Sequence, residues 1–156
     1  MNQYRAKQCP FCESVLDAAF AESEHFIALY NIAPILPGHS LVVPKLHVES
    51  LMDLTEADLS EFIIFSRNIA KLLSRAFKTD AFDWTIQEKE AAGQTVAHLH
   101  MHIIPRKPGD LPQSGDWYPL LQKSETGVID SASRSRLSTE QMREMVSYLK
   151  GCARLN

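Results

Sequence analysis

The sequence predicts an α+β domain in which helices cover one face of a mostly antiparallel sheet. Segments with the alternating pattern of strands stand on both sides of one long amphipathic segment, and a second helical segment follows near the end of the chain. With 156 residues, of which 45% are hydrophobic and 22% charged, the chain has the size and composition of a single globular domain. We therefore expect one domain over residues 1–156, with its core at about 9–105, a loop-rich segment at 106–137 and a C-terminal helix at 138–151.

The charge and the absence of long apolar runs exclude several classes of partner. The formal net charge is -3, whereas a protein that binds nucleic acid through its surface charge carries clustered lysine and arginine residues. No apolar run approaches the roughly 18 residues that a membrane-spanning helix needs, and the N-terminal residues contain no apolar segment of a secretory signal. We expect a cytoplasmic protein with a small-molecule ligand and no nucleic-acid or membrane partner.

The first elements are a short helix and two strands. Residues 13–20 are expected to form the helix. Phe26–Tyr30 has the composition of a strand, and Pro37-Gly38 marks a turn. A second strand is predicted over His39–Val43, ended by Pro44.

The longest predicted element is a helix over about residues 56–77. Thr55 and Asp58 have the spacing of a capping box at its start. Apolar residues then recur at helical spacing: Leu59, Phe62, Ile63, Ile69, Ala70, Leu73, Ala76 and Phe77.

The second half of the chain adds two strands. Residues 82–87 and 98–104 alternate like strands, with a polar loop at 88–93 between them. Pro105 is expected to close the later strand.

The C-terminal part is predicted to be a loop followed by a helix. Residues 106–137 are rich in proline and polar residues. Ser138 and Gln141 have the spacing of a second capping box, ahead of a helix at about 139–150 that Gly151 ends.

Three of the six histidines stand at alternate positions in the segment GQTVAHLHMHII. Side chains alternate between the two faces of a strand, so His98, His100 and His102 should share one face, about 6–7 Å apart along the chain. The apolar residues between and after them should point the other way, under the long helix: Leu99, Met101 and Ile103. The apolar face is expected to belong to the core and the imidazole face to a site.

The residues alone leave three roles open for these histidines. They could be partly exposed strand residues without a chemical role. They could hold a metal ion, although three successive residues on one face of a flat strand seldom converge on one ion. As neutral imidazoles they could act as a nucleophile or as general acids and bases. The preceding Gly93-Gln94-Thr95 offers backbone N–H groups, an amide and a hydroxyl, which suit phosphate oxygens and favour the third role.

The pair Cys9 and Cys12 has the spacing of half a zinc site. In a reducing compartment, such a pair is a metal or redox pair rather than a disulfide. No thioredoxin-like βαβ pattern follows it, which disfavours a redox role. Two cysteines without a shared role remain the alternative. Cys152 and His25 are expected to lie outside any site.

The segment His98–Ile104, HLHMHII, resembles the signature of the histidine triad (HIT) family. Asn31–His39, followed by a strand and Pro44-Lys45, looks like the nucleoside-binding segment of that family, and residues 9–105 line up with it in order. The resemblance implies a HIT-like α+β meander, usually a homodimer with one shared sheet. It also implies an enzyme that transfers or hydrolyses nucleotides at the α-phosphate.

Two further segments, Ile86–Val96 and Pro105–Asp110, resemble the fragile-histidine-triad branch, whose members split dinucleoside polyphosphates such as diadenosine triphosphate. Phosphorylase and transferase relatives carry glutamine at the third triad position, where this chain has His102, and this favours water as the final acceptor. The resemblance thus implies a dinucleoside polyphosphate hydrolase. Two other functions stay open: a nucleoside phosphoramidase that releases AMP from P–N substrates, and a nucleotide-binding sensor with slow hydrolysis.

The resemblance also assigns roles to the histidines. His100 is the expected nucleophile, which attacks the α-phosphorus and forms a nucleotidyl-histidine that water then cleaves. His98 is expected to orient and polarise His100. His102 should lie near the scissile bridge, and His39 should complete the histidine cluster.

Five residues are expected, by the same resemblance, to bind substrate. Gln94 and Thr95 would bind oxygens of the α-phosphate, and Gln87 the bridging or leaving phosphates. Asn31 would bind the ribose hydroxyls and Ile32 would contact the nucleoside, although without the resemblance Asn31 would be interpreted as a turn residue. A divalent cation such as Mg²⁺ is expected to arrive with the polyphosphate.

Many bacterial members of the family pair a CxxC with two histidines around a structural zinc ion. By resemblance, the ligands here are Cys9, Cys12, His47 and His98, a donor set that suits zinc. Such a site would tie the N-terminus to the triad and fix the ring of His98. Because the CxxC is not typical of the dinucleoside hydrolases, the sequence combines features of two branches.

Overall fold

The computed structural model describes residues 9–13, 17–122 and 134–154. At its centre is a five-stranded sheet in the order β1-β2-β3-β5-β4, in which every neighbouring pair is antiparallel. The strands are β1 (Ala19–Glu22), β2 (Phe26–Tyr30), β3 (Ser40–Pro44), β4 (Ala81–Ile86) and β5 (Met101–Arg106). The predicted α+β class with an antiparallel sheet is confirmed.

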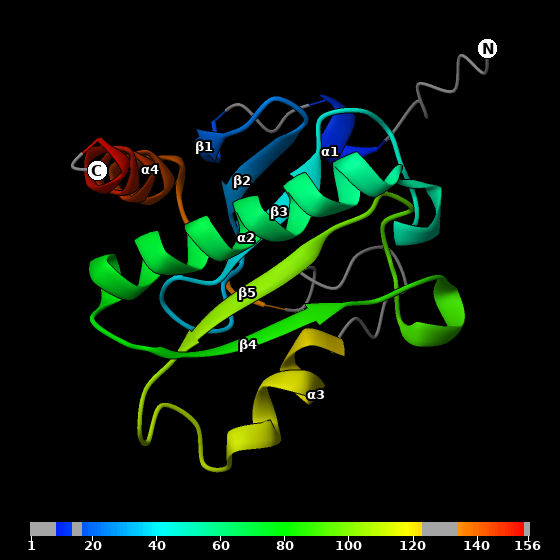
Figure 1. Ribbon diagram of the computed structural model, residues 1–156. Helices are drawn as coiled ribbons and strands as arrows, with labels where there is room; N and C mark the ends of the chain where they lie inside the picture. Colours follow the sequence, from blue (N-terminus) through cyan, green and yellow to red (C-terminus); the bar gives the residue numbers. More distant parts are fainter. Residues whose placement is uncertain (1–8, 14–16, 123–133, 155–156) are drawn as a thin grey trace.

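Two helices cover one face of this sheet (Figure 1). α2 (Glu56–Phe77) has the predicted bounds, and the hydroxyl of Thr55 caps it by accepting a hydrogen bond from Asp58 N at 3.1 Å. α4 (Thr139–Ala153) packs beside α2 and next to β1, with the predicted capping box at its start. None of the helices in the described segments is long and apolar enough to cross a membrane.

The remaining helices are short. α1 (Pro10–Glu13) carries the second cysteine, and α3 (Trp117–Gln122) lies within the predicted C-terminal loop. Single turns of 3-10 helix occupy Leu51–Asp53, Glu90–Ala92 and Ser114–Asp116.

The main core fills the space between the sheet and the two long helices. Met101 and Ile103 point into it, as predicted, whereas Leu99 is buried outside it. A smaller apolar cluster on the opposite face joins Leu29 and Leu41 to Phe11 of α1. His102 alternates with Met101 and Ile103 along β5, so its side chain lies on this second face.

The predicted strand at 98–104 is displaced along the chain. β5 begins only at Met101, because Leu99 N donates to the carbonyl of Val48 at 2.6 Å instead of to a neighbouring strand. His98 and His100 therefore lie in the loop that precedes the strand, where the backbone bends at residues 96–98.

Pro105 lies inside β5, and the prediction that it closes the strand was wrong. It pairs with Phe82 of β4, whereas β3 pairs with β5 only as far as Ile103. At Pro105 no bond to β3 is required, so the missing proline N–H does not interrupt that pairing.

Two further predictions were wrong. The predicted helix at 13–20 does not form, because α1 ends at Glu13 and Ala19 already pairs with Leu29 of β2; residues 14–16 lie outside the described segments. Gly151 does not end the last helix, which runs on to Ala153. Cys152 and Ala153 pack against the main core, and this packing extends the helix past the glycine.

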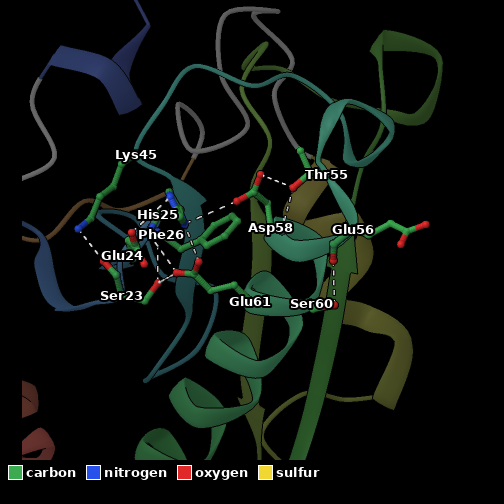
Figure 2. Close-up of polar contacts among 10 residues, drawn as sticks. All are labelled: Ser23, Glu24, His25, Phe26, Lys45, Thr55, Glu56, Asp58, Ser60 and Glu61. Carbon is green, nitrogen blue, oxygen red and sulfur yellow. Dashed lines mark hydrogen bonds and ion pairs between the residues drawn. The ribbon is translucent and has the colours of Figure 1, made fainter.

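The turn between β1 and β2 is fastened to α2 by a group of polar side chains (Figure 2). His25 Nδ1 donates to Glu61 Oε2 at 2.7 Å, while Ser23 Oγ and His25 N donate to Glu61 Oε1 at 2.6 and 3.0 Å. The hydrogen bond to Glu61 raises the pKa of His25, and the bond from Ser23, followed by that from His25, lowers the pKa of Glu61 to about 2. His25 is a surface residue, as expected, and it also connects two elements.

Candidate active site and metal site

The structure divides the predicted histidine cluster into two groups. His100 and His102 have ring centroids 5.1 Å apart, and His39 lies 5.2 Å from His102. The ring of His98 instead stands 5.1 Å from that of His47. All three triad histidines and His39 are buried.

The turn that precedes β3 positions His39. Gly38 has φ +92°, and a Cβ atom there would lie 2.6 Å from the Pro105 side chain and 2.9 Å from the Phe77 ring. Only glycine allows the chain to pass this close to both side chains. The hydroxyl of Tyr30 accepts a hydrogen bond from Gly38 N at 3.0 Å, which holds the turn in place.

Hydrogen bonds fix the protons of His39 and His102. His39 Nδ1 accepts from Ile35 N at 3.1 Å, so a neutral His39 carries its proton on Nε2. That Nε2–H donates to His102 Nδ1 at 2.9 Å, and a neutral His102 then carries its own proton on Nε2. Burial, with a smaller effect of the Arg134 charge, lowers the pKa of His39 to about 3. Burial also places the pKa of His102 well below its usual value.

The tautomer of His100 is fixed from the opposite side. Its Nδ1 lies 2.6 Å from the backbone oxygen of His98, and because a carbonyl oxygen only accepts, Nδ1 must donate. In a neutral His100 the lone pair is therefore on Nε2. In this structure His98 contacts His100 through its backbone carbonyl, whereas its ring faces the two cysteines.

His100 and His102 line a cavity of about 1020 Å³, at the upper end of the range of roughly 300–1,000 Å³ for small-molecule sites. Asn31 and Ile32 also line it, as the sequence predicted. Further walls come from apolar residues that were not predicted: Phe11, Leu29, Leu41 and Val96. The cavity wall therefore combines apolar side chains with many polar ones, among them Asn31, His100 and His102, and such a wall suits a small polar organic ligand.

Asn31 has the turn role that the sequence left open, while its contact with the ribose stays a prediction. Its Oδ1 accepts a hydrogen bond from Ala33 N at 2.9 Å, which is the turn role that asparagine favours. The same side chain is buried at the edge of the cavity. Ile32 is 45% exposed, as a residue that contacts a ligand from the rim would be.

The other predicted substrate residues, Gln87, Gln94 and Thr95, do not line the cavity in this structure. Gln94 Oε1 accepts from Lys89 N at 2.6 Å, and Gln94 Nε2 donates to Glu49 O at 3.2 Å, so its amide holds two loops together. Gln87 is buried, and no hydrogen-bond partner for its Nε2 occurs among the described residues. Their phosphate-binding roles stay predictions.

The four predicted metal ligands come together. Cys9, Cys12, His47 and His98 each offer one ligand atom, and these atoms lie within 4.8 Å of one another. His98 Nδ1 is 3.4 Å from Cys9 Sγ and 3.6 Å from Cys12 Sγ, and His47 Nδ1 is 3.3 Å from Cys12 Sγ. Zinc bonds of about 2.3 Å to sulfur and 2.0–2.1 Å to nitrogen, at a tetrahedral angle, separate sulfur from nitrogen by about 3.5 Å.

The proton of His98 agrees with a ligand role. Its Nε2 lies 3.0 Å from the carbonyl oxygen of Pro44, so Nε2 donates and the lone pair of Nδ1 faces the two sulfur atoms. Burial is the main cause that lowers the pKa of His98 to about 4, which keeps the ring neutral. A backbone carbonyl that fixes the tautomer of the ligating histidine in this way is typical of histidine–zinc sites.

Phe11 joins the metal site to the histidines of the cavity. Its ring centroid lies 5.6 Å from that of His98 and 5.3 Å from that of His100. In the sequence, the position of Phe11 between Cys9 and Cys12 is the one feature that indicates its contact with both sites. Arg134, whose charge acts on His39, carried no comparable signal because it belongs to the predicted loop.

Comparison with known proteins agrees with the resemblance. The HIT domain family model matches residues 14–109. An asymmetrical bis(5'-nucleosyl)-tetraphosphatase from Schizosaccharomyces pombe is 41% identical over 98 residues, which make up 63% of this chain and 54% of that protein. The match therefore spans about half the length of this curated relative.

Two solved structures share the fold. A Plasmodium falciparum diadenosine triphosphate hydrolase in complex with cyclomarin A has a TM-score of 0.72 at 25% identity, covering 90% of this chain and 79% of that chain. A zinc-bound histidine triad family protein from Mycobacterium smegmatis has a TM-score of 0.58 at 25% identity, covering 88% of this chain and 85% of that chain. Since the family model matches more than half of its residues, the chain belongs to the HIT domain family.

Proposed function

We propose that this protein hydrolyses dinucleoside polyphosphates at the α-phosphate through a nucleotidyl-His100 intermediate. The observation that carries the proposal is the hydrogen bond from His100 Nδ1 to the His98 carbonyl, which leaves the lone pair on Nε2 of a residue lining the cavity. The similar proteins support the substrate class, since one is a dinucleoside tetraphosphatase and another a diadenosine triphosphate hydrolase.

In the first step, His100 Nε2 forms a bond to the α-phosphorus and the bond to the bridging oxygen breaks. The leaving group is a nucleoside di- or triphosphate, which departs through an oxygen of its terminal phosphate. This group is stable as an anion near neutral pH. The N–H that a neutral His102 carries on Nε2 donates a hydrogen bond to a phosphate oxygen. Water then attacks the phosphorus and releases AMP, His100 regains its lone pair, and the proton of the water passes to solvent.

The remaining residues bind the substrate. Asn31 contacts the ribose hydroxyls and Ile32 the nucleoside, and the positions of both residues on the cavity wall support these roles. Gln94 and Thr95 bind the α-phosphate and Gln87 the bridging phosphates, which requires the amide of Gln94 to exchange its loop contacts for the ligand. Mg²⁺ arrives with the polyphosphate and neutralises part of its charge.

The proposal includes a structural zinc ion. Cys9, Cys12, His47 and His98 hold it, and the observed sulfur–nitrogen separations support this donor set. The ion would supply no step of the reaction. It would fix His98 and so the carbonyl that orients His100.

We further propose that the protein works in the cytoplasm as a homodimer. The support for the dimer is β4, an edge strand of the sheet on which Trp84 is 44% exposed. Pairing between two β4 strands would cover this edge.

The function is tested by comparing kcat/KM for diadenosine triphosphate and adenosine 5'-phosphoramidate on one preparation with Mg²⁺ present. We expect a strong preference for the dinucleotide, with AMP and ADP as products. A preference for the phosphoramidate would make the protein a phosphoramidase with the same nucleophile. Tight nucleotide binding with turnover far below ordinary enzyme rates would indicate a sensor.

A further inference from the structure

Arg134 connects two separate parts of the structure through their backbone carbonyls. Its Nε donates to the carbonyl oxygen of Ala33 at 2.7 Å, and its Nη1 donates to those of Leu120 and Leu121 at 3.2 and 3.5 Å. The last two acceptors belong to the final turn of α3, where helix carbonyls have no partner within the helix. Arg134 therefore fastens Ala33 to the end of α3. It lies beyond residues 14–109, so the family assignment does not supply this contact.

A second hydrogen bond holds the same turn. Leu137 N donates to the carbonyl oxygen of Ile32 at 2.8 Å, so the segment Arg134–Leu137 bonds to two successive residues, Ile32 and Ala33. Ser138 then caps α4, whose apolar side is buried in the main core. The segment is thus anchored by α4 at one end, and it can serve as a fixed support for the turn.

The supported turn carries the residue that is proposed to bind the ribose. Ala33 is buried, and its N–H donates to Asn31 Oδ1 at 2.9 Å. Asn31 Nδ2 lies 3.4 Å from His39 Nε2, but that nitrogen carries a proton of its own, which it donates to His102. Nδ2 is therefore the end of the amide that can donate to a ribose oxygen. The orientation of this amide depends on the position of Ala33.

The guanidinium of Arg134 also acts on the pair His39 and His102. Burial lowers the pKa of His39 to about 3, and the charge of Arg134 contributes to this shift. Burial is also the main cause that lowers the pKa of His102, and Arg134 adds a smaller effect. Arg134 does not line the cavity, however. It can therefore affect a bound substrate only through the residues that lie between them.

We propose that Arg134 is a positioning residue, which aligns Asn31 with the ribose of the retained nucleotide by holding Ala33 against α3. The inference rests on the proposed function, in which His100 retains one nucleotide and Asn31 binds its ribose hydroxyls. The bond from Arg134 fixes the carbonyl of Ala33, and the N–H of Ala33 fixes the amide of Asn31. Loss of the guanidinium should let the turn move and should weaken the contact with the ribose.

The test compares two substrates that differ only in the ribose. kcat/KM is measured for diadenosine triphosphate and for its analogue with 2'-deoxyribose in both halves, because either nucleotide can be the one that is retained. The wild type should prefer the ribose form. In Arg134→Met this preference should fall about fivefold, mainly through KM for the ribose substrate. An equal loss for both substrates, no loss for either, or a wild type that does not distinguish them would overturn the proposal.

A second set of variants tests whether Arg134 acts through Asn31. Asn31→Ala should lose the ribose preference by itself. In that background, Arg134→Met should change the remaining preference by less than about twofold, because the effects of residues that act through one chain of contacts are not additive. A fivefold further fall in the double variant would overturn the proposal.

Matched controls separate this effect from loss of charge or fold. Arg136 belongs to the same segment, is exposed and does not line the cavity, so Arg136→Met should keep the KM and the ribose preference of the wild type. Arg134→Lys keeps the charge and one donor for the Ala33 carbonyl, and it should lose less of the preference than Arg134→Met. Arg134→Lys is also the variant to measure if Arg134→Met does not fold, and an equal loss for both substrates in it would again overturn the proposal.

A failure of the proposed function can be told apart from a failure of this role. If the wild type does not hydrolyse diadenosine triphosphate, the function is wrong, and Arg134 is then judged by binding. Kd for AMP and for 2'-deoxyadenosine 5'-monophosphate is measured on the wild type and on Arg134→Met. A larger loss of affinity for AMP supports the positioning role. Equal losses, or a wild type that binds neither nucleotide, reject it.

Discussion

His100 Nδ1 lies 2.6 Å from the carbonyl oxygen of His98, so the backbone of one triad histidine selects the reactive nitrogen of the next. A side chain that donated to Nδ1 instead would reverse the tautomer and move the lone pair away from the phosphorus. The first two triad positions are thus joined through the backbone, while the ring of His98 is left for the cysteines.

Replacing the nucleophile should abolish turnover. His100→Ala is expected to lower kcat for diadenosine triphosphate by about 10³-fold or more, because the variant lacks the Nε2 atom that is proposed to attack the phosphorus. Rapid-quench samples of the wild type should also contain protein that is heavier by one adenylyl group, and the variant should not form it. His25→Ala is the control, because His25 does not line the cavity, and this variant should keep wild-type kcat. Near-normal hydrolysis by His100→Ala would exclude the assignment.

The buried histidines should make the protein less stable in acid. Burial lowers the pKa of His39 to about 3, below the usual value of about 6.5 in the unfolded chain. Between these two values the unfolded state binds the proton and the folded state does not, so stability is fully present above about pH 6.5 and falls as the pH drops toward about 3. Urea unfolding at pH 7, 5.5 and 4 measures this. His39→Gln should be less stable at pH 7, and its deficit should shrink toward pH 4; a deficit that is constant with pH would contradict the prediction.

The hydrogen bond between His25 and Glu61 should change stability with pH in the opposite direction, because it stabilises the folded protein more in acid than in base. The pKa of His25 is raised, mainly by its hydrogen bond to Glu61, so its contribution is present below the unfolded value and is lost as pH rises through the folded one. Glu61, with a pKa lowered to about 2, stays ionised across this range. His25→Ala should therefore lower Tm at pH 5.5 and have little effect at pH 9. Glu61→Gln should show the same pattern, and an equal change in Tm at both pH values would rule out the ion pair.

Much of the fold could be predicted because its strongest signals are local. The bounds of α2 follow from the cap at Thr55 and an apolar period sustained over six turns, and both survive in the structure. The end of α4 could not be predicted in this way. A glycine within a helix costs only about 1 kcal/mol relative to alanine, and contacts of Cys152 and Ala153 with a distant core outweigh it.

The candidate site was predictable where residues are close in sequence or carried by a motif. The triad spacing identified His100 and His102, and the motif resemblance brought His47 and His98 to the cysteines. The place of His98 outside β5 depends on a hydrogen bond between Leu99 and Val48, which no local pattern encodes. The contribution of α4 to the cavity wall is also a tertiary feature, because Arg143 reaches the cavity only through the packing of its helix beside β1.

Loss of the metal site should lower both stability and turnover. Protein purified without added metal is expected to contain about one zinc ion per chain, and Cys12→Ser should lose it. Removal of several kcal/mol of binding energy should lower Tm by about 10 °C. The carbonyl of His98 would then be less firmly held, so kcat should fall while KM for AMP-containing substrates changes less.

Cys152→Ser is the control for loss of a thiol, because Cys152 lies outside the metal group, and it should keep its zinc and kcat. Metal analysis, thermal unfolding and kinetics on the two variants together test whether the zinc ion is bound and whether it supports turnover. Zinc-free wild-type protein with unchanged Tm in Cys12→Ser would reject the site. Zinc loss with a lower Tm but an unchanged kcat would keep the metal site and reject its link to His100, since the bond from His100 Nδ1 to His98 would then be held by β5 and its neighbours alone.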